Sequence, residues 1–162
     1  MFVRYSRRTV DLRHVSAVTV TAALAAGAGA GPARASAPQV VTMNGSSVSA
    51  APYKGLKTQS FRLVDQKDGS TGIRSFYDDK MVLTLNGTSV SGQKYAGNAW
   101  QSFMMVKQKD GSTGIRSYYK RTALTMQNGR VFGAQYTGQK TQSFKVVKQS
   151  DGSTGIRAFY SK

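Results

Sequence analysis

Hydrophobic and polar residues alternate in short runs over most of this chain. Val41 and Met43 share one face of such a run, and Leu83 and Leu85 share the matching face of another run further along. Alternation with a period of two predicts β-strands with one buried face. Because no segment combines a helical period with capping residues, the pattern predicts an all-β fold.

The alternating pattern occurs three times with nearly the same letters. The stretch "DGSTGIR" begins at Asp68, Asp110 and Asp151, so successive repeats are offset by 42 and then 41 residues. Self-similarity at such a period is typical of folds built from one structural unit. The repeats cover about residues 40–80, 81–122 and 123–162.

Each repeat predicts four short strands. A turn containing Asn and Gly separates the first two strands, and the third strand places Phe61 and Leu63 on one face with Arg62 on the other. "DGSTG" then predicts a tight hairpin turn, and "GIR" begins the fourth strand. Three such units are fewer than the four blades of the smallest usual propeller and predict a β-trefoil with pseudo-threefold symmetry. In that fold we expect the isoleucine after each turn to be buried.

A short signature in each repeat resembles that of a known family. "TQSF", "WQSF" and "TQSF", which end at Phe61, Phe103 and Phe144, resemble the Gln-x-Trp motif of ricin-B-type β-trefoil lectins, with Phe in place of the Trp. The resemblance covers about residues 40–162 and implies the trefoil fold and carbohydrate binding. We expect the Gln of each signature to hold its loop by hydrogen bonds to the backbone. Trefoils also serve as inhibitors, cytokines and actin bundlers, and these alternatives stay open.

The sugar-contacting positions of that family hold other residue types in this chain. The family uses an Asp after the first strand, a stacking aromatic residue from the second strand and a polar residue before the Gln. The corresponding residues here are Thr42, Thr84 and Thr125, then Ala51, Gln93 and Ala134, and finally Thr58, Trp100 and Thr141. The chain therefore departs from the galactose-type pattern of the family.

Other groups suited to sugar binding lie in the same loops. Aromatic faces and amide donors are typical of shallow polar sites. The predicted carbohydrate-binding residues are Tyr53, Tyr95, Asn98, Trp100, Tyr136 and Gln139. Trp100 is the only Trp and stands where the other repeats have Thr, which favours a place at the rim of the fold. Two alternatives stay open: the tyrosines as core residues, and the Trp as a plug beside Ala96 and Ala99.

The first 35 residues differ in composition from the repeats. They combine a basic start, a weakly apolar stretch diluted by Gly, Ala and Thr, and small residues before Ala35. This composition predicts an export signal cleaved after Ala35 or Ala37, with residues 36–162 forming the trefoil domain. "SRRTVDL" resembles the twin-arginine signature, so the export route stays open. We expect a secreted, extracellular protein without a membrane span, and a disordered N-terminal tail is the alternative.

The predicted mature chain is strongly basic. Removing residues 1–35 leaves 18 Lys and Arg against six Asp, a net charge of +12. Such a charge attracts anionic polymers, such as teichoic acid, acidic polysaccharide or nucleic acid. Arg74, Arg116 and Arg157 follow the repeated isoleucines and project from the opposite face, which makes them candidate anion-binding residues. A solvated surface role is the alternative.

The usual catalytic residue sets are missing after residue 35. This part of the chain has no Cys, Glu or His, so nucleophile, base and metal-ligand sets cannot be assembled from those residues. Asp65 with Asp78 or Asp79 is the remaining carboxylate pair. Each "DGSTG" turn offers one carboxylate, too few for calcium. The sequence predicts a non-enzymatic, monomeric module without cofactor or metal that binds glycans or cell-surface polysaccharide, with anionic polymers as the alternative.

Overall fold

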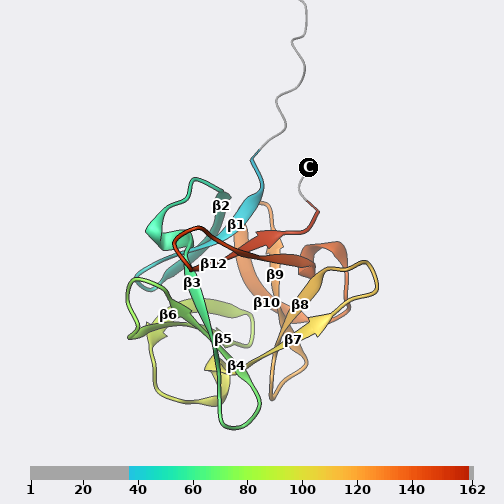
Figure 1. Ribbon diagram of the computed structural model, residues 1–162. Coiled ribbons are helices and arrows are strands. Elements are labelled where there is room, and N and C mark those ends of the chain that lie inside the picture. The colour runs from blue at the N-terminus through green and yellow to red at the C-terminus, as the bar shows by residue number, and fades with distance from the viewer. Residues whose placement is uncertain (1–36, 161–162) are drawn as a thin grey trace, which may run out of the picture. The chain divides into compact units, whose positions relative to one another are not determined.

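Twelve β-strands and three short 3-10 turns build residues 37–160, which are the residues that the computed structural model describes (Figure 1). The first repeat contains β1 (Gln39–Asn44), β2 (Ser47–Pro52), η1 (Lys57–Gln59), β3 (Phe61–Asp65) and β4 (Thr71–Ser75). The second contains β5 (Met81–Asn86), β6 (Ser89–Lys94), η2 (Ala99–Gln101), β7 (Phe103–Lys107) and β8 (Thr113–Ser117). The third contains β9 (Thr122–Gln127), β10 (Arg130–Gln135), η3 (Lys140–Gln142), β11 (Phe144–Lys148) and β12 (Thr154–Ala158). Four strands per repeat are confirmed, and the predicted export signal lies outside the described residues.

Six of the strands close into a barrel. The pairs β3–β4, β7–β8 and β11–β12 form within repeats, and β4 pairs with β7, β8 with β11 and β12 with β3 between repeats. The pairing returns to its starting strand, so the barrel has no open edge. Closure therefore requires all three repeats at once.

Three β-hairpins complete the fold beside the barrel. The hairpins β1–β2, β5–β6 and β9–β10 are attached to β12, β4 and β8 respectively. Each hairpin tip accepts a backbone hydrogen bond from the second strand of another hairpin. These bonds run from Gly92 N–H to the Ser46 carbonyl (3.0 Å), from Gly133 to Thr88 (2.9 Å) and from Ala50 to Gly129 (3.0 Å). The three tips thus hold one another in a closed ring.

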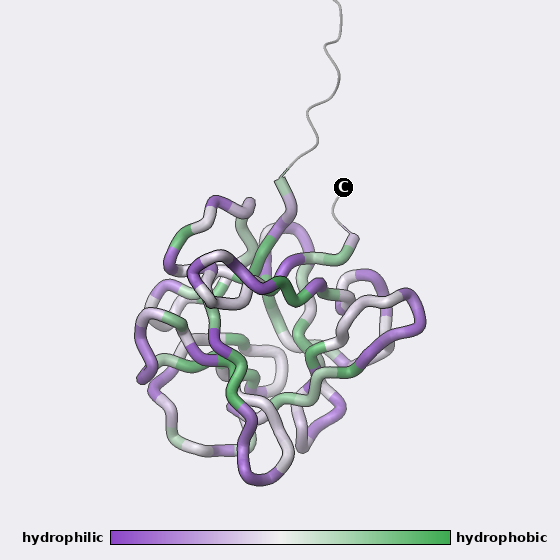
Figure 2. The backbone as a smooth tube through the Cα atoms, in the orientation of Figure 1, coloured by the Kyte–Doolittle hydropathy of each residue, from purple (hydrophilic) through white to green (hydrophobic). Residues whose placement is uncertain are grey.

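The core consists of equivalent residues from the three repeats. The fully buried side chains include Phe61, Phe103, Phe144, Ile73, Ile115 and Ile156. Hydrophobic segments follow the strands, whereas hydrophilic segments gather in the outer loops (Figure 2). The predicted core positions of the repeated isoleucines are confirmed.

The Gln of each Gln-Ser-Phe signature is a buried scaffold residue. Gln101 Nε2 donates to the Lys94 carbonyl (2.9 Å) and to Thr84 Oγ1 (3.3 Å), and its Oε1 accepts from the Ala96 N–H (2.8 Å). Gln59 and Gln142 make the equivalent bonds. The predicted loop-holding role is confirmed. The threonine that replaces the family's sugar-contacting Asp is therefore a partner of this scaffold.

The repeated "DGSTG" stretch forms the β3–β4 type of hairpin turn. Its first glycine is Gly69, Gly111 or Gly152, with φ values of 82°, 83° and 83°, a backbone region that favours glycine. The turn aspartate accepts a hydrogen bond from the N–H two residues on, as Asp68 does from Ser70 (2.9 Å). The prediction of tight turns that visit positive φ is confirmed.

The same turn aspartates join the repeats to one another. Each receives a hydrogen bond from a tyrosine that follows the fourth strand of another repeat. The bonds run from Tyr119 Oη to Asp68 (2.7 Å), from Tyr160 to Asp110 (2.7 Å) and from Tyr77 to Asp151 (2.8 Å). We call these three bonds the Asp–Tyr ring, because together they link the first repeat to the second, the second to the third and the third to the first.

Candidate functional site

Three equivalent hollows lie between the repeats. Each is lined by the tip of a hairpin, by the 3-10 turn of the same repeat and by the start of the next repeat. The first hollow includes Asn44, Gly45, Thr58 and Met81, the second Asn86, Gly87, Trp100 and Thr122, and the third Gln127, Asn128, Thr141 and Gln39. Their volumes are about 180, 390 and 480 Å³ in that order. These three hollows are the candidate binding sites.

The second hollow differs from the other two because its 3-10 turn contributes an indole, whereas the aromatic lining residues of the first and third hollows are Tyr77 and Tyr160. Trp100 lies in η2 with 43% of its surface exposed. This exposure disagrees with the alternative of a Trp that plugs a gap in the fold. The remaining lining residues are Leu85, Asn86, Gly87, Lys120, Arg121, Thr122 and Gln135. The second hollow therefore places an exposed indole among amide, hydroxyl and cationic groups.

Asn98 positions this tryptophan. Its side-chain oxygen accepts a hydrogen bond from the Trp100 N–H (3.2 Å), and its carbonyl accepts one from the Gln101 N–H (3.0 Å). Such capping by Asn satisfies an N–H group at the start of a helical turn. The equivalent residues, Leu56 and Gln139, make no side-chain capping bond. The Asn and the Trp are thus linked departures of the second repeat from the other two.

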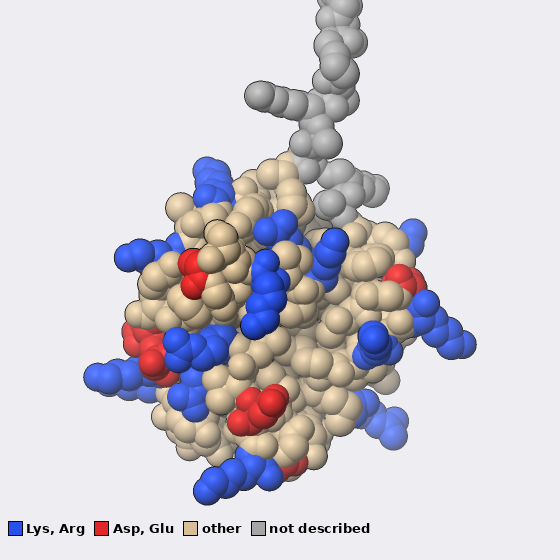
Figure 3. All heavy atoms as spheres, in the orientation of Figure 1, with Lys and Arg blue, Asp and Glu red and all other residues tan. Residues whose placement is uncertain are grey.

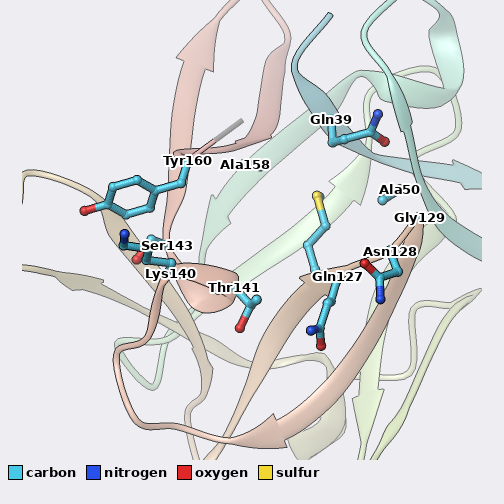
Figure 4. Close-up of a pocket in the computed structure, with 11 residues that line it drawn as sticks. Gln39, Ala50, Gln127, Asn128, Gly129, Lys140, Thr141, Ser143, Ala158 and Tyr160 are labelled. Carbon is cyan, nitrogen blue, oxygen red and sulfur yellow. The ribbon is translucent and has the colours of Figure 1, made fainter. Parts of the chain in front are cut away.

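The third hollow is the largest of the three and has Thr141 in place of the Trp. Figure 4 shows Thr141 and Lys140 on its η3 side, and Gln39 and Asn128 on its hairpin side. The Lys140 ammonium lies 5.2 Å from the ring centre of Tyr160, another lining residue. The predicted residue Gln139 is exposed in the loop before η3 but does not line this hollow. Its backbone carbonyl accepts a hydrogen bond from the Gln142 N–H (2.8 Å).

Two of the predicted tyrosines lie instead at the junctions between repeats, each stacked against a predicted arginine. The Arg74 guanidinium lies 4.2 Å from the ring centre of Tyr95, and the Arg157 guanidinium lies 4.0 Å from that of Tyr53. The Tyr53 hydroxyl also donates to Gln149 Oε1 (2.8 Å). One face of each ring is therefore covered by protein. The structure thus pairs members of the two predicted residue sets, and neither pair lines the second hollow.

The third junction, between the second and third repeats, is arranged differently. Tyr136 is half-buried and lies against Gly114, where an added Cβ would come within 2.9 Å of the ring. Arg116 Nη2 lies 3.5 Å from the Met104 sulfur. The three predicted Arg and Tyr pairs are thus not equivalent, although their sequence positions are.

Hydrogen bonding shifts the pKa of the groups in the Asp–Tyr ring. The serine two residues on lowers the pKa of Asp68, Asp110 and Asp151 most, and the tyrosine hydroxyl lowers it further. The same bonds raise the pKa of Tyr77, Tyr119 and Tyr160, because each phenol donates to a carboxylate. The ring therefore favours an ionised Asp and a neutral Tyr.

Comparisons with known proteins support the fold. No protein-family model matches the chain, and no curated protein does. Among solved structures, a designed 3-fold symmetric protein, ThreeFoil, is 19% identical with a TM-score of 0.57, over 65% of this chain and 87% of that one. A mosquitocidal holotoxin is 15% identical with a TM-score of 0.60, over 76% of this chain but only 16% of the toxin's length. The fold is a β-trefoil.

Residues 37–160 carry an excess of positive charge and form few salt bridges. Residues 37–160 contain 17 Lys and Arg, since five of the 23 precede residue 36 and one is Lys162, against six Asp. Within these residues one salt bridge forms, between Arg62 and Asp79 (3.0 Å). Lys and Arg side chains are spread over the visible face (Figure 3). On the face that Figure 3 shows, the positive charge is therefore distributed over the surface.

Residues 37–160 contain neither a membrane-spanning helix nor a cluster of metal-ligating side chains. No helix in residues 37–160 has the length and apolar character needed to cross a membrane. No three His, Cys, Asp or Glu side chains of these residues group as a metal site.

Several lining residues of the second hollow were not predicted from the sequence. Lys120 and Arg121 come from the link into β9, Thr122 begins β9, and Gln135 ends β10. They reach Trp100 because the third repeat packs against the hairpin tip of the second. The one available signal was the threefold alignment itself, which places Thr122 at the same repeat position as Gln39 and Met81.

Proposed function

We propose that this protein is a secreted β-trefoil module that binds carbohydrate, with the second hollow as its principal site. The observation that carries the proposal is the exposed Trp100 indole on the wall of an open hollow of about 390 Å³. Secretion is proposed from the predicted export signal in residues 1–35.

The chemistry of the hollow suits a sugar ring. The flat indole offers an apolar face to the C–H groups of a pyranose, and its position at the rim leaves that face accessible. Asn86 and Gln135 offer amide donors and acceptors, and Thr122 offers a hydroxyl. Because the hollow is open to solvent and covers only part of a sugar, we expect weak binding at one site. The first and third hollows are lined by Tyr77 and Tyr160 but lack the indole, and would bind more weakly, so useful avidity would come from a polymeric glycan.

A glycan panel probed at low and high salt tests the proposal. We expect binding to at least one neutral oligosaccharide that persists at high salt, because stacking and neutral hydrogen bonds are little screened. The test variant is Trp100→Thr, which installs the residue that both other repeats carry at this position. The variant should keep its melting temperature and lose about tenfold or more in affinity. Neutral-sugar binding that is unchanged in Trp100→Thr would refute the assignment of the site.

An anionic polymer is the second candidate ligand. Residues 37–160 contain 17 Lys and Arg, and only one of them forms a salt bridge with an Asp. Most of the positive charge is therefore available to a ligand. Lys120 and Arg121 also line the second hollow, where the indole could stack on a base. Binding only to acidic polymers, with an affinity that collapses at high salt, would favour this candidate over the lectin.

A further inference from the structure

A second type of hollow lies at the junction between the first and second repeats. Its volume is about 450 Å³, and it is lined by Arg74, Asp79, Lys80, Lys94 and Tyr95. Three of these five residues are cations. Trp100 does not line it, so this junction hollow is separate from the proposed sugar site.

The arginine in the junction hollow is held in a defined orientation. Its guanidinium stacks on the Tyr95 ring at 4.2 Å, which restricts the plane of the group. Its Nε atom is buried without a hydrogen-bond partner, as are those of Arg116 and Arg157. A planar guanidinium fixed in this way is suited to binding an oxyanion through paired N–H groups.

The one acidic residue in the hollow is already engaged. Asp79 accepts from Arg62 Nη1 at 3.0 Å, and the side chains of Asp79 and Arg62 are 64% and 48% exposed. Arg62 thus partly offsets the carboxylate's charge. The positive charge of Arg74, Lys80 and Lys94 therefore dominates the junction hollow.

The other two junctions carry different charged residues. Between the second and third repeats, Lys120 stands at the position of Asp79, but Lys120 and Arg121 line the second hollow. At the position of Lys80 they carry Arg121 and Pro38, and at the position of Lys94 they carry Gln135 and Pro52. The junction between the third and first repeats keeps the Arg157–Tyr53 stack but has proline at both other positions. The fold requires neither lysine, because the other repeats dispense with both.

We infer that this junction hollow binds one anionic group, a sulfate or a carboxylate, of an acidic polysaccharide. The compact grouping of three cations in one hollow fits a single oxyanion, whereas a nucleic-acid backbone is typically bound by a basic groove that follows successive phosphates. The choice of a polysaccharide as the carrier rests on the proposed carbohydrate binding; the anion site itself does not.

Three polymers with one backbone test the inference. Binding of dextran, carboxymethyl-dextran and dextran sulfate to the full mature chain is measured by fluorescence anisotropy of the labelled polymer, with an oligothymidylate in parallel. The test variant is Lys80→Ala with Lys94→Gln. The control is Lys67→Ser with Lys109→Ser, which removes the same charge and installs the serine that the third repeat carries as Ser150.

We expect the test variant to lose about tenfold or more in affinity for dextran sulfate or carboxymethyl-dextran, because it loses two charged contacts. The control should lose about twofold or less, because its lysines contribute only to the general field. Whichever of the two charged dextrans binds more tightly identifies the anionic group. An Arg74→Lys variant, which keeps the charge but not the planar stack, should also bind more weakly than the native chain.

Equal losses in the test and control variants would overturn the inference in favour of a diffuse field, as would failure of both charged dextrans to bind. Tighter binding of the oligothymidylate, lost in the test variant, would identify a nucleic acid as the occupant and also overturn it. Neutral-sugar binding at Trp100 is measured on the same variants and should be unchanged. If the native protein itself bound no neutral sugar, the proposed function would be refuted instead.

Discussion

Single residues decide how the three hairpin tips fit together. An added Cβ on Gly92 would lie 2.1 Å from the Gly45 carbonyl oxygen, and one on Gly133 would lie 2.1 Å from that of Gly87. In the third contact, the strand residue that donates its N–H to the hairpin tip is Ala50. It meets a different turn, with Asn128 and Gly129 at φ 50° and 73° as in a type I′ turn. The residue on the strand and the turn that it meets therefore vary together.

The substitution Gly92→Ala should destabilise the trefoil strongly. The new methyl group would collide with backbone and force the hairpins apart, at a cost of about 1–3 kcal/mol or more in the free energy of unfolding. Ala50→Gly is the matched control at the equivalent position and should cost only about 0.5–1 kcal/mol. Urea denaturation measures both values. Equal costs would show that the tips do not pack as described.

Sequence reasoning succeeded at the residue scale where it compared equivalent positions. The surface place of Trp100 was predicted because both other repeats have Thr there, and a threefold core leaves no room for one larger residue. The stacks of Arg74 on Tyr95 and of Arg157 on Tyr53 were not predicted. Each stack joins two repeats, and strand alternation describes only which face a side chain takes.

At the scale of the elements, the hairpin turns are also the connectors between repeats. Turn chemistry predicted the "DGSTG" hairpins, because Asp and Gly have local conformational preferences. The bond from Tyr119 to Asp68 spans 51 residues and has no local signature. The identity of the three turns in sequence therefore reflects two demands, a tight turn and a partner for the tyrosine of the next repeat.

The Asp–Tyr ring predicts a pH dependence of stability. Because the fold lowers the pKa of the three aspartates below 3.8, their contribution is full above pH 3.8 and is lost as the pH falls through the lowered pKa. Because it raises the pKa of the three tyrosines above 10.0, that contribution is full below pH 10.0 and is lost as the pH rises through the raised pKa. Thermal melting across this range measures both limbs.

A triple variant isolates the ring. Replacing Tyr77, Tyr119 and Tyr160 by Phe removes the three phenolic hydroxyl groups and keeps the aromatic side chains. We expect a lower melting temperature at neutral pH and a smaller further loss above pH 10.0 than in the native chain. Tyr95→Phe is the control, since its hydroxyl makes no hydrogen bond to another described residue. An alkaline limb of the same size in the triple variant would contradict a stabilising role for the ring.

At the scale of the whole molecule, near-identical repeats produce non-identical surfaces. The core and the barrel pairing repeat three times, but the three hollows and the three junctions differ in volume and lining. Both proposed sites lie where the repeats disagree in sequence, at Trp100 and at Lys80 with Lys94. The scaffold is thus threefold, whereas its proposed binding surface is not.

The threefold scaffold predicts that a second sugar site can be installed. Thr141→Trp places an indole beside the third hollow, which at about 480 Å³ is the largest of the three. The Thr141 hydroxyl has no hydrogen-bond partner among the described residues, so the substitution breaks no hydrogen bond of this hydroxyl. We expect two sugar equivalents per chain in calorimetric titration and tighter binding to a polymeric glycan. An unchanged stoichiometry would show that an exposed indole is not sufficient.

The fluorescence of Trp100 tests the central claim most directly, because this residue is the only Trp in the chain. The mature protein is titrated at high salt with the neutral oligosaccharide that binds best in the glycan panel. The proposed site predicts a saturable blue shift and intensity change as the sugar covers the half-exposed indole, with the same midpoint as binding measured by calorimetry. Calorimetric binding with an unchanged emission spectrum would place the sugar elsewhere and contradict the account.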